Sequence, residues 1–182
     1  SDLAPLAGMT CLYRLHLEAN QVSDVSPLAD VIRLRLLYLD ENQISDLTSF
    51  AGLAGTHLLH LNLNENQITD LSPLAALPGL TSLYLSGNQI SDLSGLEGLS
   101  ALHTLDLADN QVSALGPLAG LMELDHLYLD DNQISDLSPL AGLTQLRTAY
   151  LGDNAISDIS PLAGLTSLGF VQLETNDISD LS

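Results

Sequence analysis

The chain repeats one phrase along its length, and this periodicity limits its possible folds more than any other feature. The sequence NQISDLSPLAGL, residues 132–143, returns in close or looser form around seven other asparagines: Asn20, Asn42, Asn66, Asn88, Asn110, Asn154 and Asn176. The spacing is 22 residues throughout, except for one step of 24 whose two extra residues lie within residues 53–57. A catalytic site needs unlike groups in one place, whereas evenly spaced copies describe how a chain is built. Function is therefore expected at the positions that differ between copies.

Each repeat follows the pattern LxxLxLxxNxISDLSPLAxLxx, as in residues 80–101. Leucines at the fourth and sixth positions alternate with polar residues, which is typical of a short strand with one buried face. We expect Leu83 and Leu85 to point inward and Ser82 and Tyr84 outward. The ninth-position asparagine, Asn88 here, is expected to end the strand and to bond backbone groups of neighbouring turns.

The second half of the repeat predicts a short helical turn. Asp136 is expected to accept a hydrogen bond from the amide two residues on, and Ser138 followed by Pro139 is typical of an N-cap and a first helical residue. So few residues remain before the next strand that only a turn or two of 3₁₀ or short α-helix fits. Leu140 and Leu143, three residues apart, should close that side of the core.

With eight recurrences of LxxLxLxxN in register, the whole chain resembles the leucine-rich repeat family. The likeness is to its 22-residue class, known from bacterial internalins and from a regulatory subunit of type-1 protein phosphatase. The resemblance implies an α/β repeat solenoid, right-handed and curved, with a parallel β-sheet on the concave face and short 3₁₀ or helical turns on the convex side. It also implies one continuous domain over residues 1–182 that works by binding.

No motif for catalysis accompanies the repeats. The sequence contains no G-x-S-x-G, H-E-x-x-H, P-loop or G-x-G-x-x-G pattern, so we expect neither an enzyme nor a cofactor. His103, Asp125 and His126 fall on neighbouring predicted strands, and we interpret them as an ordinary exposed polar cluster in preference to a metal site. Cys11, the only cysteine, is expected to be a small buried residue.

Some copies depart from the pattern without being expected to break it. Ala149 and Val171 replace the fourth-position leucine, and Gly95 replaces proline. No terminal cap is visible, so the chain is expected to be a fragment of a longer protein. Its first coil, opening on Leu3, and its last, closing on Leu181, are expected to lack cover, which favours weak end-to-end self-association.

The variable positions gather the residue types that bind ligands. The second, third and fifth positions of the pattern hold three of the four arginines, four of the five histidines and all five tyrosines. Tyrosine and arginine contribute strongly at protein interfaces, although strand propensity alone could also place tyrosines there. The predicted ligand-binding residues are Tyr38, Tyr84, Asp106, His126, Tyr128, Arg147, Tyr150 and Phe170.

Charge narrows the choice of partner. The chain has 23 acidic residues, four arginines and a formal net charge of −19, so it should repel nucleic acid and anionic membrane surfaces. No apolar run approaches the roughly 20 residues of a membrane span. The acidic residues gather at the seventh and eighth positions of the repeat. They form a solvated face, a collar that steers a basic partner, or a calcium site at Asp109, Asp130, Asp131 and Asp153, although no D-x-D-x-D loop is present.

These observations favour a non-enzymatic module that binds a protein ligand, basic or glycan-bearing, through its concave face. Composition and repeat class favour a bacterial secreted or cell-surface protein. Two alternatives stay open: an intracellular regulatory scaffold resembling the phosphatase subunit, and an engineered consensus scaffold. The irregular variable positions and the 24-residue repeat argue against the second of these.

Overall fold

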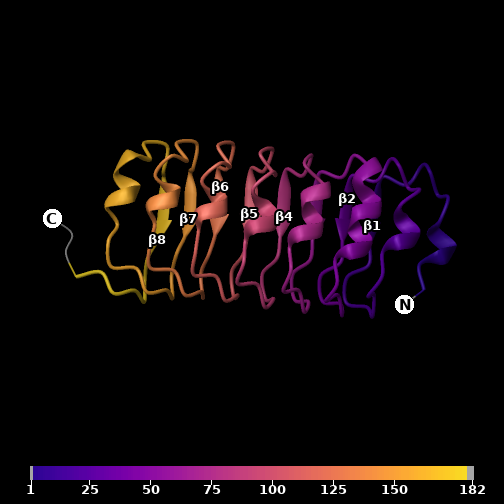
Figure 1. Cartoon of the computed structure of the whole chain (residues 1–182), viewed down its shortest axis with the longest axis horizontal. Helices are drawn as coiled ribbons and strands as arrows, with labels where there is room; N and C mark the ends of the chain where they lie inside the picture. Colours follow the sequence, from indigo (N-terminus) through magenta and orange to yellow (C-terminus); the bar gives the residue numbers. More distant parts are fainter. Residues whose placement is uncertain (1, 180–182) are drawn as a thin grey trace.

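The computed structural model describes residues 2–179 as a stack of coils, each with one short strand and one 3₁₀ helix (Figure 1). The strands are β1 (Arg14–His16), β2 (Leu36–Tyr38), β3 (His60–Asn62), β4 (Ser82–Tyr84), β5 (Thr104–Asp106), β6 (His126–Tyr128), β7 (Thr148–Tyr150) and β8 (Phe170–Gln172). The 3₁₀ helices are η1 (Ala4–Leu6), η2 (Ser26–Leu28), η3 (Thr48–Gly55), η4 (Ser72–Ala76), η5 (Ser94–Leu96), η6 (Gly116–Leu118), η7 (Ser138–Leu140) and η8 (Ser160–Gly164).

The strands form one parallel sheet in chain order, β1 to β8, so that each coil pairs only with the coils before and after it. The register joins equivalent positions of successive repeats, for example Leu83 with Leu105 and Tyr84 with Asp106. This arrangement confirms the predicted repeat solenoid with a parallel sheet. Across residues 2–179, none of the helices combines the length and the apolar character needed to cross a membrane.

A continuous leucine core lies between the sheet and the row of 3₁₀ helices. Leu83 and Leu85 are fully buried while Tyr84 is partly exposed, which confirms the predicted alternation. Leu140 and Leu143 are also fully buried. Because each repeat places leucines at the same depth, one core runs through all the coils.

The turn into each 3₁₀ helix except η6, which has Ala114 at this position, depends on an aspartate. The Asp136 carboxylate accepts bonds from the Ser138 amide at 2.8 Å and from the Ser138 hydroxyl at 2.9 Å, which confirms the predicted Asx-type turn. These bonds hold the pKa of Asp136 below its usual value. The prediction that Ser138 is the N-cap was wrong, since Ser138 is the first helical residue and its hydroxyl bonds Asp136 instead of capping the helix.

Two coils depart from the repeat pattern in their length or sequence. The extra residues of the 24-residue repeat lengthen η3 to eight residues. Gly95 stands where most other copies have proline, and a Cβ there would lie 2.2 Å from the carbonyl oxygen of Leu71. Backbone of the preceding coil therefore leaves no room for a side chain at this point.

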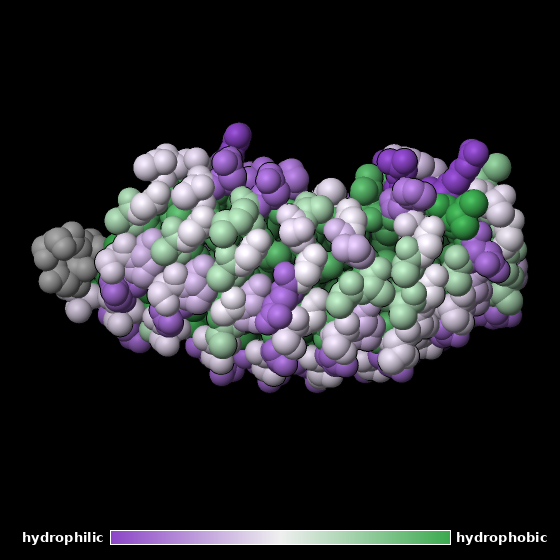
Figure 2. All heavy atoms as spheres, turned by 45° about the horizontal axis from the view of Figure 1, so that its top comes forward, coloured by the Kyte–Doolittle hydropathy of each residue, from purple (hydrophilic) through white to green (hydrophobic). Residues whose placement is uncertain are grey.

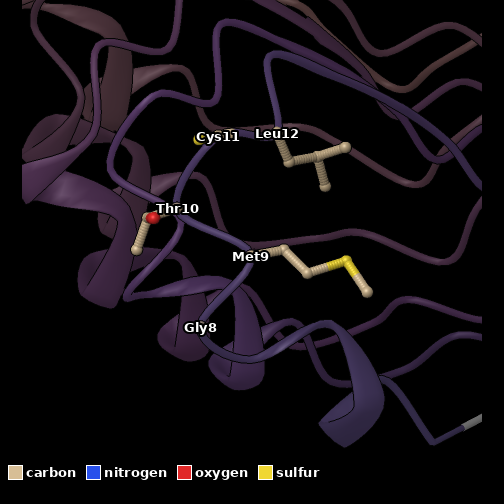
Figure 3. A pocket seen from close by; sticks show the side chains of 5 residues that line it. All are labelled: Gly8, Met9, Thr10, Cys11 and Leu12. Atoms are coloured by element: carbon tan, nitrogen blue, oxygen red, sulfur yellow. The ribbon is translucent and has the colours of Figure 1, made fainter.

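Two expectations near the termini need correction. Cys11 is exposed and not buried, because it occupies the last position of the repeat, where Arg33 and Glu123 are exposed as well. Figure 3 shows its segment, residues 8–12, which lines an open cavity of about 520 Å³. Leu3 was expected to lack cover, but only 5% of it is exposed because it packs into the common core. Leu181 lies outside the described residues.

Candidate binding face

The outward side chains of the sheet, at the third and fifth positions of each repeat, form a surface that we call the sheet face. Rings on this face contact one another from strand to strand. One row consists of His16, Tyr38, His60 and Tyr84, with ring centroids 4.3, 4.7 and 5.0 Å apart. A second row consists of Tyr128, Tyr150 and Phe170, with centroids 4.9 and 5.0 Å apart. All five centroid distances lie within or just below the range of favourable aromatic pairs.

Asp106 on β5 separates the two rows. It pairs in register with Tyr84 on β4 and with Tyr128 on β6, so a carboxylate stands between two tyrosines on adjacent strands. Its Oδ1 accepts the Ala108 amide at 3.1 Å. Burial, and then the charge of Asp130, raise the pKa of Asp106 above its usual value even though the Ala108 bond lowers it.

Burial also raises the pKa of the two flanking tyrosines, and the Asp106 charge contributes to this effect. Both phenols therefore stay neutral at physiological pH. In residues 2–179 the ion pairs are His16 with Glu18 and His126 with Asp125, so no cationic side chain of the described coils neutralises Asp106. A partly buried carboxylate between two neutral tyrosine rings is suited to receive a cation from outside.

The N-terminal row includes two histidines that the predicted set omits. The His16 ring lies flat on Tyr38, with an interplanar angle of 2°. Burial and the nearby Arg14 lower the pKa of His60, so its ring is neutral at pH 7 as it packs between Tyr38 and Tyr84. The signal for both was their place beside tyrosines in adjacent repeats, because equivalent positions meet in a solenoid.

The remaining predicted residues are spread more widely. His126 lies on β6, and its Nε2 is 3.8 Å from Asp125 Oδ1, which is too long for a hydrogen bond. Arg147 lies beside the sheet face, where it lines a cavity of about 250 Å³ with His103, Glu123, Asp125 and Gln145. Phe170 is 47% exposed at the end of the second row. The structure therefore brings the tyrosines and Asp106 together more closely than it brings His126 and Arg147.

The acidic residues of the eighth position sit in a special backbone conformation. Asp109, Asp131 and Asp153 have φ of +50°, +53° and +50°, a left-handed region in which aspartate is tolerated better than most residues. Asp130, at the seventh position, instead bonds the Gly152 amide at 3.1 Å. No three carboxylate, histidine or cysteine side chains gather into a potential metal site within residues 2–179, so the four calcium candidates are not brought together.

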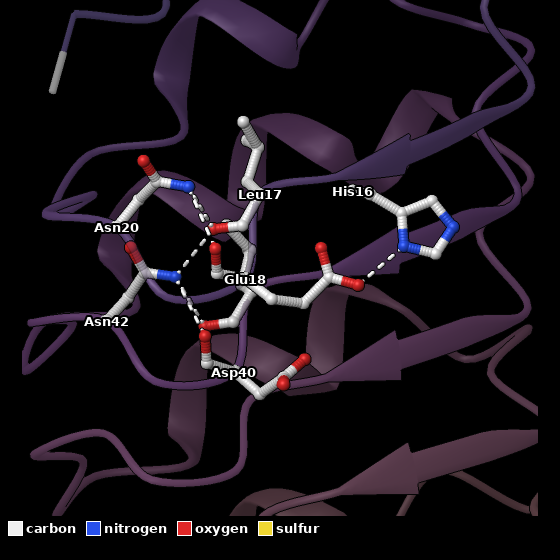
Figure 4. Close-up of polar contacts among 7 residues, drawn as sticks. His16, Leu17, Glu18, Asn20, Asp40 and Asn42 are labelled. Carbon is white, nitrogen blue, oxygen red and sulfur yellow. Dashed lines mark hydrogen bonds and ion pairs between the residues drawn. The ribbon is translucent and has the colours of Figure 1, made fainter.

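The ninth-position asparagines form a column along the solenoid (Figure 4). This asparagine column supports the turn that carries the acidic residues of the seventh and eighth positions, which we call the acidic rim. Asn42 Nδ2 donates to the carbonyls of Leu17, Leu39 and Asp40 at 2.9 to 3.1 Å. Its Oδ1 accepts the Val22 amide of the preceding coil at 2.8 Å. The same four bonds recur at every later asparagine with a described coil on each side, such as Asn88. The predicted role of the column in joining neighbouring turns is confirmed.

Known proteins share this architecture. A family profile described as Leucine Rich repeats (2 copies) matches residues 56–98 and 100–142. The internalin inlF of Listeria monocytogenes is 39% identical with a TM-score of 0.87, over 99% of this chain and 52% of its own. Internalin C2 of the same organism is 43% identical with a TM-score of 0.84, over 91% of this chain and 72% of its own. This chain thus spans about half the length of the first of these internalins and nearly three quarters of the second.

More distant proteins share the fold alone. The plant peptide hormone receptor RGFR1, solved in complex with RGF2, is 24% identical with a TM-score of 0.79, over 95% of this chain and 30% of its own. Comparison with curated proteins finds no match. The repeat pattern, the eight-stranded parallel sheet and the identity to internalins agree: the chain belongs to the leucine-rich repeat family and has repeats of the internalin type.

Proposed function

We propose that the sheet face is the binding surface for a protein ligand and that Asp106 receives a basic side chain of that ligand. The observation that carries the proposal is the position of Asp106 between Tyr84 and Tyr128, without a cation from the described coils. An arginine or lysine inserted there gains a charge-assisted bond to the carboxylate and faces two aromatic rings. Tyr38, Tyr150 and Phe170 extend the contact surface on either side.

The overall charge supports a basic ligand. With a formal net charge of −19, the chain attracts a basic protein at long range and raises its rate of encounter. The acidic rim beside the sheet face adds to this attraction. Binding, and not catalysis, is the proposed activity. We further propose, from the likeness to internalins, that this binding takes place outside a bacterial cell or at its surface.

Selection from a displayed peptide library tests the site, because the library itself supplies the candidate ligands. Peptides selected on the wild-type chain should be enriched in arginine or lysine. Tyr128→Ala should weaken the binding of these peptides by about 2 kcal/mol, or about thirtyfold in Kd, while the chain stays folded and its thermal unfolding midpoint falls only by the loss of the Tyr150 stack. Asp106→Asn should weaken them as well, because it removes the charge and keeps the shape.

Tyr13→Ala is the matched control. Tyr13 is the one tyrosine outside the sheet face, and it is 53% exposed, so its loss should change neither folding nor the affinity of the selected basic peptides. Selected peptides without basic residues, or peptides whose affinity is indifferent to Tyr128 and Asp106, would contradict the proposal.

A further inference from the structure

A second recessed surface lies outside the sheet face, on the edge where each coil passes from its 3₁₀ helix to its strand. We call this the helix-to-strand edge. Near its N-terminal end a groove of about 620 Å³ is lined by Tyr13, Ile32, Arg33, Arg35, Gly55 and His57. Figure 2 shows two separate clusters of hydrophilic side chains along the upper edge of the molecule, and the cluster toward the N-terminal end borders strongly hydrophobic surface.

Three successive coils build this groove. Tyr13 and Arg35 hold the second position of adjacent repeats, and the Arg35 amide donates to the Tyr13 carbonyl at 3.0 Å. Ile32 and Arg33 come from the segment between η2 and β2. The lengthened helix η3 contributes its last residue, Gly55, and His57 follows it before β3. The 24-residue repeat therefore forms one wall of the groove, so the two extra residues of this repeat help to shape the groove.

The groove carries positive charge that the described coils do not neutralise. Three of the four arginines of the chain lie within residues 14–35. The lining of the groove includes two of these arginines and a histidine but no acidic residue. Neither Arg33 nor Arg35 takes part in an ion pair in residues 2–179. The cavity around Arg147 differs, because Glu123 and Asp125 share its lining. In a chain of net charge −19, the N-terminal groove is a local exception.

The groove also exposes apolar surface. Tyr13 is 53% exposed and Ile32 is 52% exposed, which places both among the most exposed large hydrophobic side chains of the described coils. Apolar surface beside unpaired charges is typical of an interaction site. Guanidinium groups form paired hydrogen bonds with carboxylates, which sets the chemistry of a matching ligand.

We propose that this groove binds a short acidic peptide segment of a partner protein. A glutamate or aspartate carboxylate of the segment bonds Arg33 and Arg35, His57 adds a further donor, and a neighbouring apolar side chain covers Tyr13 and Ile32. Charge complementarity selects a short segment over a polyanion: a nucleic acid or an anionic membrane would extend beyond the groove over surface that repels it. The site is separate from the sheet face and does not depend on the function proposed for it.

NMR titration of the full chain with a capped Gly-Glu-Leu-Glu-Gly peptide tests the groove, because it detects weak binding residue by residue. The acidic peptide should shift the amide signals around Arg33, Arg35 and His57, and the same peptide with glutamine in place of both glutamates should not. Replacing both arginines, Arg33→Gln with Arg35→Gln, should raise the Kd about tenfold or more, because it removes the charge-assisted bonds. Both side chains are exposed, so thermal unfolding should stay unchanged.

Arg147→Gln is the control, because Arg147 holds the same repeat position as Arg35 and its replacement removes one positive charge outside the groove, where the double variant removes two within it. It should leave the Kd as in wild type. Tyr128→Ala should also leave it unchanged, which separates this site from the sheet face.

Each other outcome overturns the proposal. An absence of shifts at the groove rules out the site, and equal binding of the glutamine peptide shows that the carboxylates are not recognised. Tighter binding of a short oligothymidylate at the same residues indicates a polyanion site. A concentration-dependent dimer that the double variant abolishes identifies a second copy of the chain as the occupant.

Discussion

Repeats three and five make the same backbone hydrogen bond with different side chains. Asn62 ends β3 and Asp106 ends β5, at equivalent positions of their repeats. Asn62 Oδ1 accepts the amide of Asn64 at 3.0 Å, and Asp106 Oδ1 accepts the amide of Ala108 at 3.1 Å. The hydrogen bond needs an acceptor oxygen, and either an amide or a carboxylate supplies it.

The seventh position shows the same contrast. Asn64 accepts the amide of Ser86 in the next coil at 2.8 Å, and Asp130 accepts the amide of Gly152 at 3.1 Å. At both positions an amide oxygen makes the same backbone bond as a carboxylate oxygen, so the bond itself requires no charge. Burial raises the pKa of Asp106 and of Asp130, so ionisation at these sites costs stability. A cost that the backbone does not require is consistent with a role in binding.

The ninth position should behave in the opposite way, because it requires donors as well as an acceptor. Asn88 is 8% exposed, and its Nδ2 donates to the carbonyls of Leu63, Leu85 and Ser86. In Asn88→Asp a carboxylate would face three carbonyl oxygens. We expect the free energy of unfolding in urea to fall by about 3 kcal/mol or more at pH 7.

Gln89→Glu is the control, because it adds the same charge at the exposed neighbouring residue. It should lower the free energy of unfolding by less than about 0.5 kcal/mol. Because coils contact only their neighbours, Asn88→Asp should also broaden the transition by uncoupling the two halves of the solenoid. Equal losses in the two variants would show that the amide donors of the column are dispensable.

Asn62→Asp places the charge of repeat five into repeat three, and its effect should be smaller. The acceptor bond to Asn64 survives, so only the partly buried charge adds a cost. We expect a loss on the order of 1 kcal/mol in the free energy of unfolding at pH 7, the upper range for partly exposed charges. The lowered pKa of His60 keeps that ring neutral, so it offers little compensation. A loss as large as that of Asn88→Asp would show that the fifth position of repeat three does not tolerate the charge that repeat five carries, and the comparison would fail.

The fold was predictable because the same pattern of buried and turn residues recurs in eight repeats. Leu83, Asn88 and Asp136 each stand for a column of equivalent residues, so the repeat pattern assigned the inward faces and the Asx-type turn, and the family resemblance added the parallel sheet. The exceptions depend on contacts between particular coils. The absence of space at Gly95 arises from the Leu71 carbonyl one repeat earlier, and nothing within its own repeat indicates this.

The candidate site was predictable in its columns but not in its contacts. The positions of Tyr84, Asp106 and Tyr128 follow from the repeat register. Whether neighbouring rings touch depends on side-chain rotamers and on the spacing of adjacent coils, which explains why the contribution of His16 and His60 was missed. The groove beside Arg35 was missed for a different reason: its lining comes from three repeats and from the loop altered by the two extra residues.

Asp106→Asn gives the smallest effect and tests the comparison most directly. Asparagine keeps the acceptor for the Ala108 amide, as Asn62 does in repeat three, and removes a charge that lies near Asp130. We expect the free energy of unfolding at pH 7 to rise by about 0.5 kcal/mol, the ordinary size of a partly exposed charge interaction.

The pH dependence of this effect follows from the raised pKa of Asp106 in the folded state. The wild-type chain loses the contribution of Asp106 to its stability as pH rises from the usual carboxyl pKa of 3.8 through the raised value. The stability gained by Asp106→Asn is therefore full at neutral pH and vanishes below pH 3.8. Urea unfolding of both proteins from pH 7 to pH 3.5 measures this difference. A variant less stable than wild type at pH 7 would mean that the Asp106 carboxylate serves the fold itself, and its availability for a ligand would lose its main support.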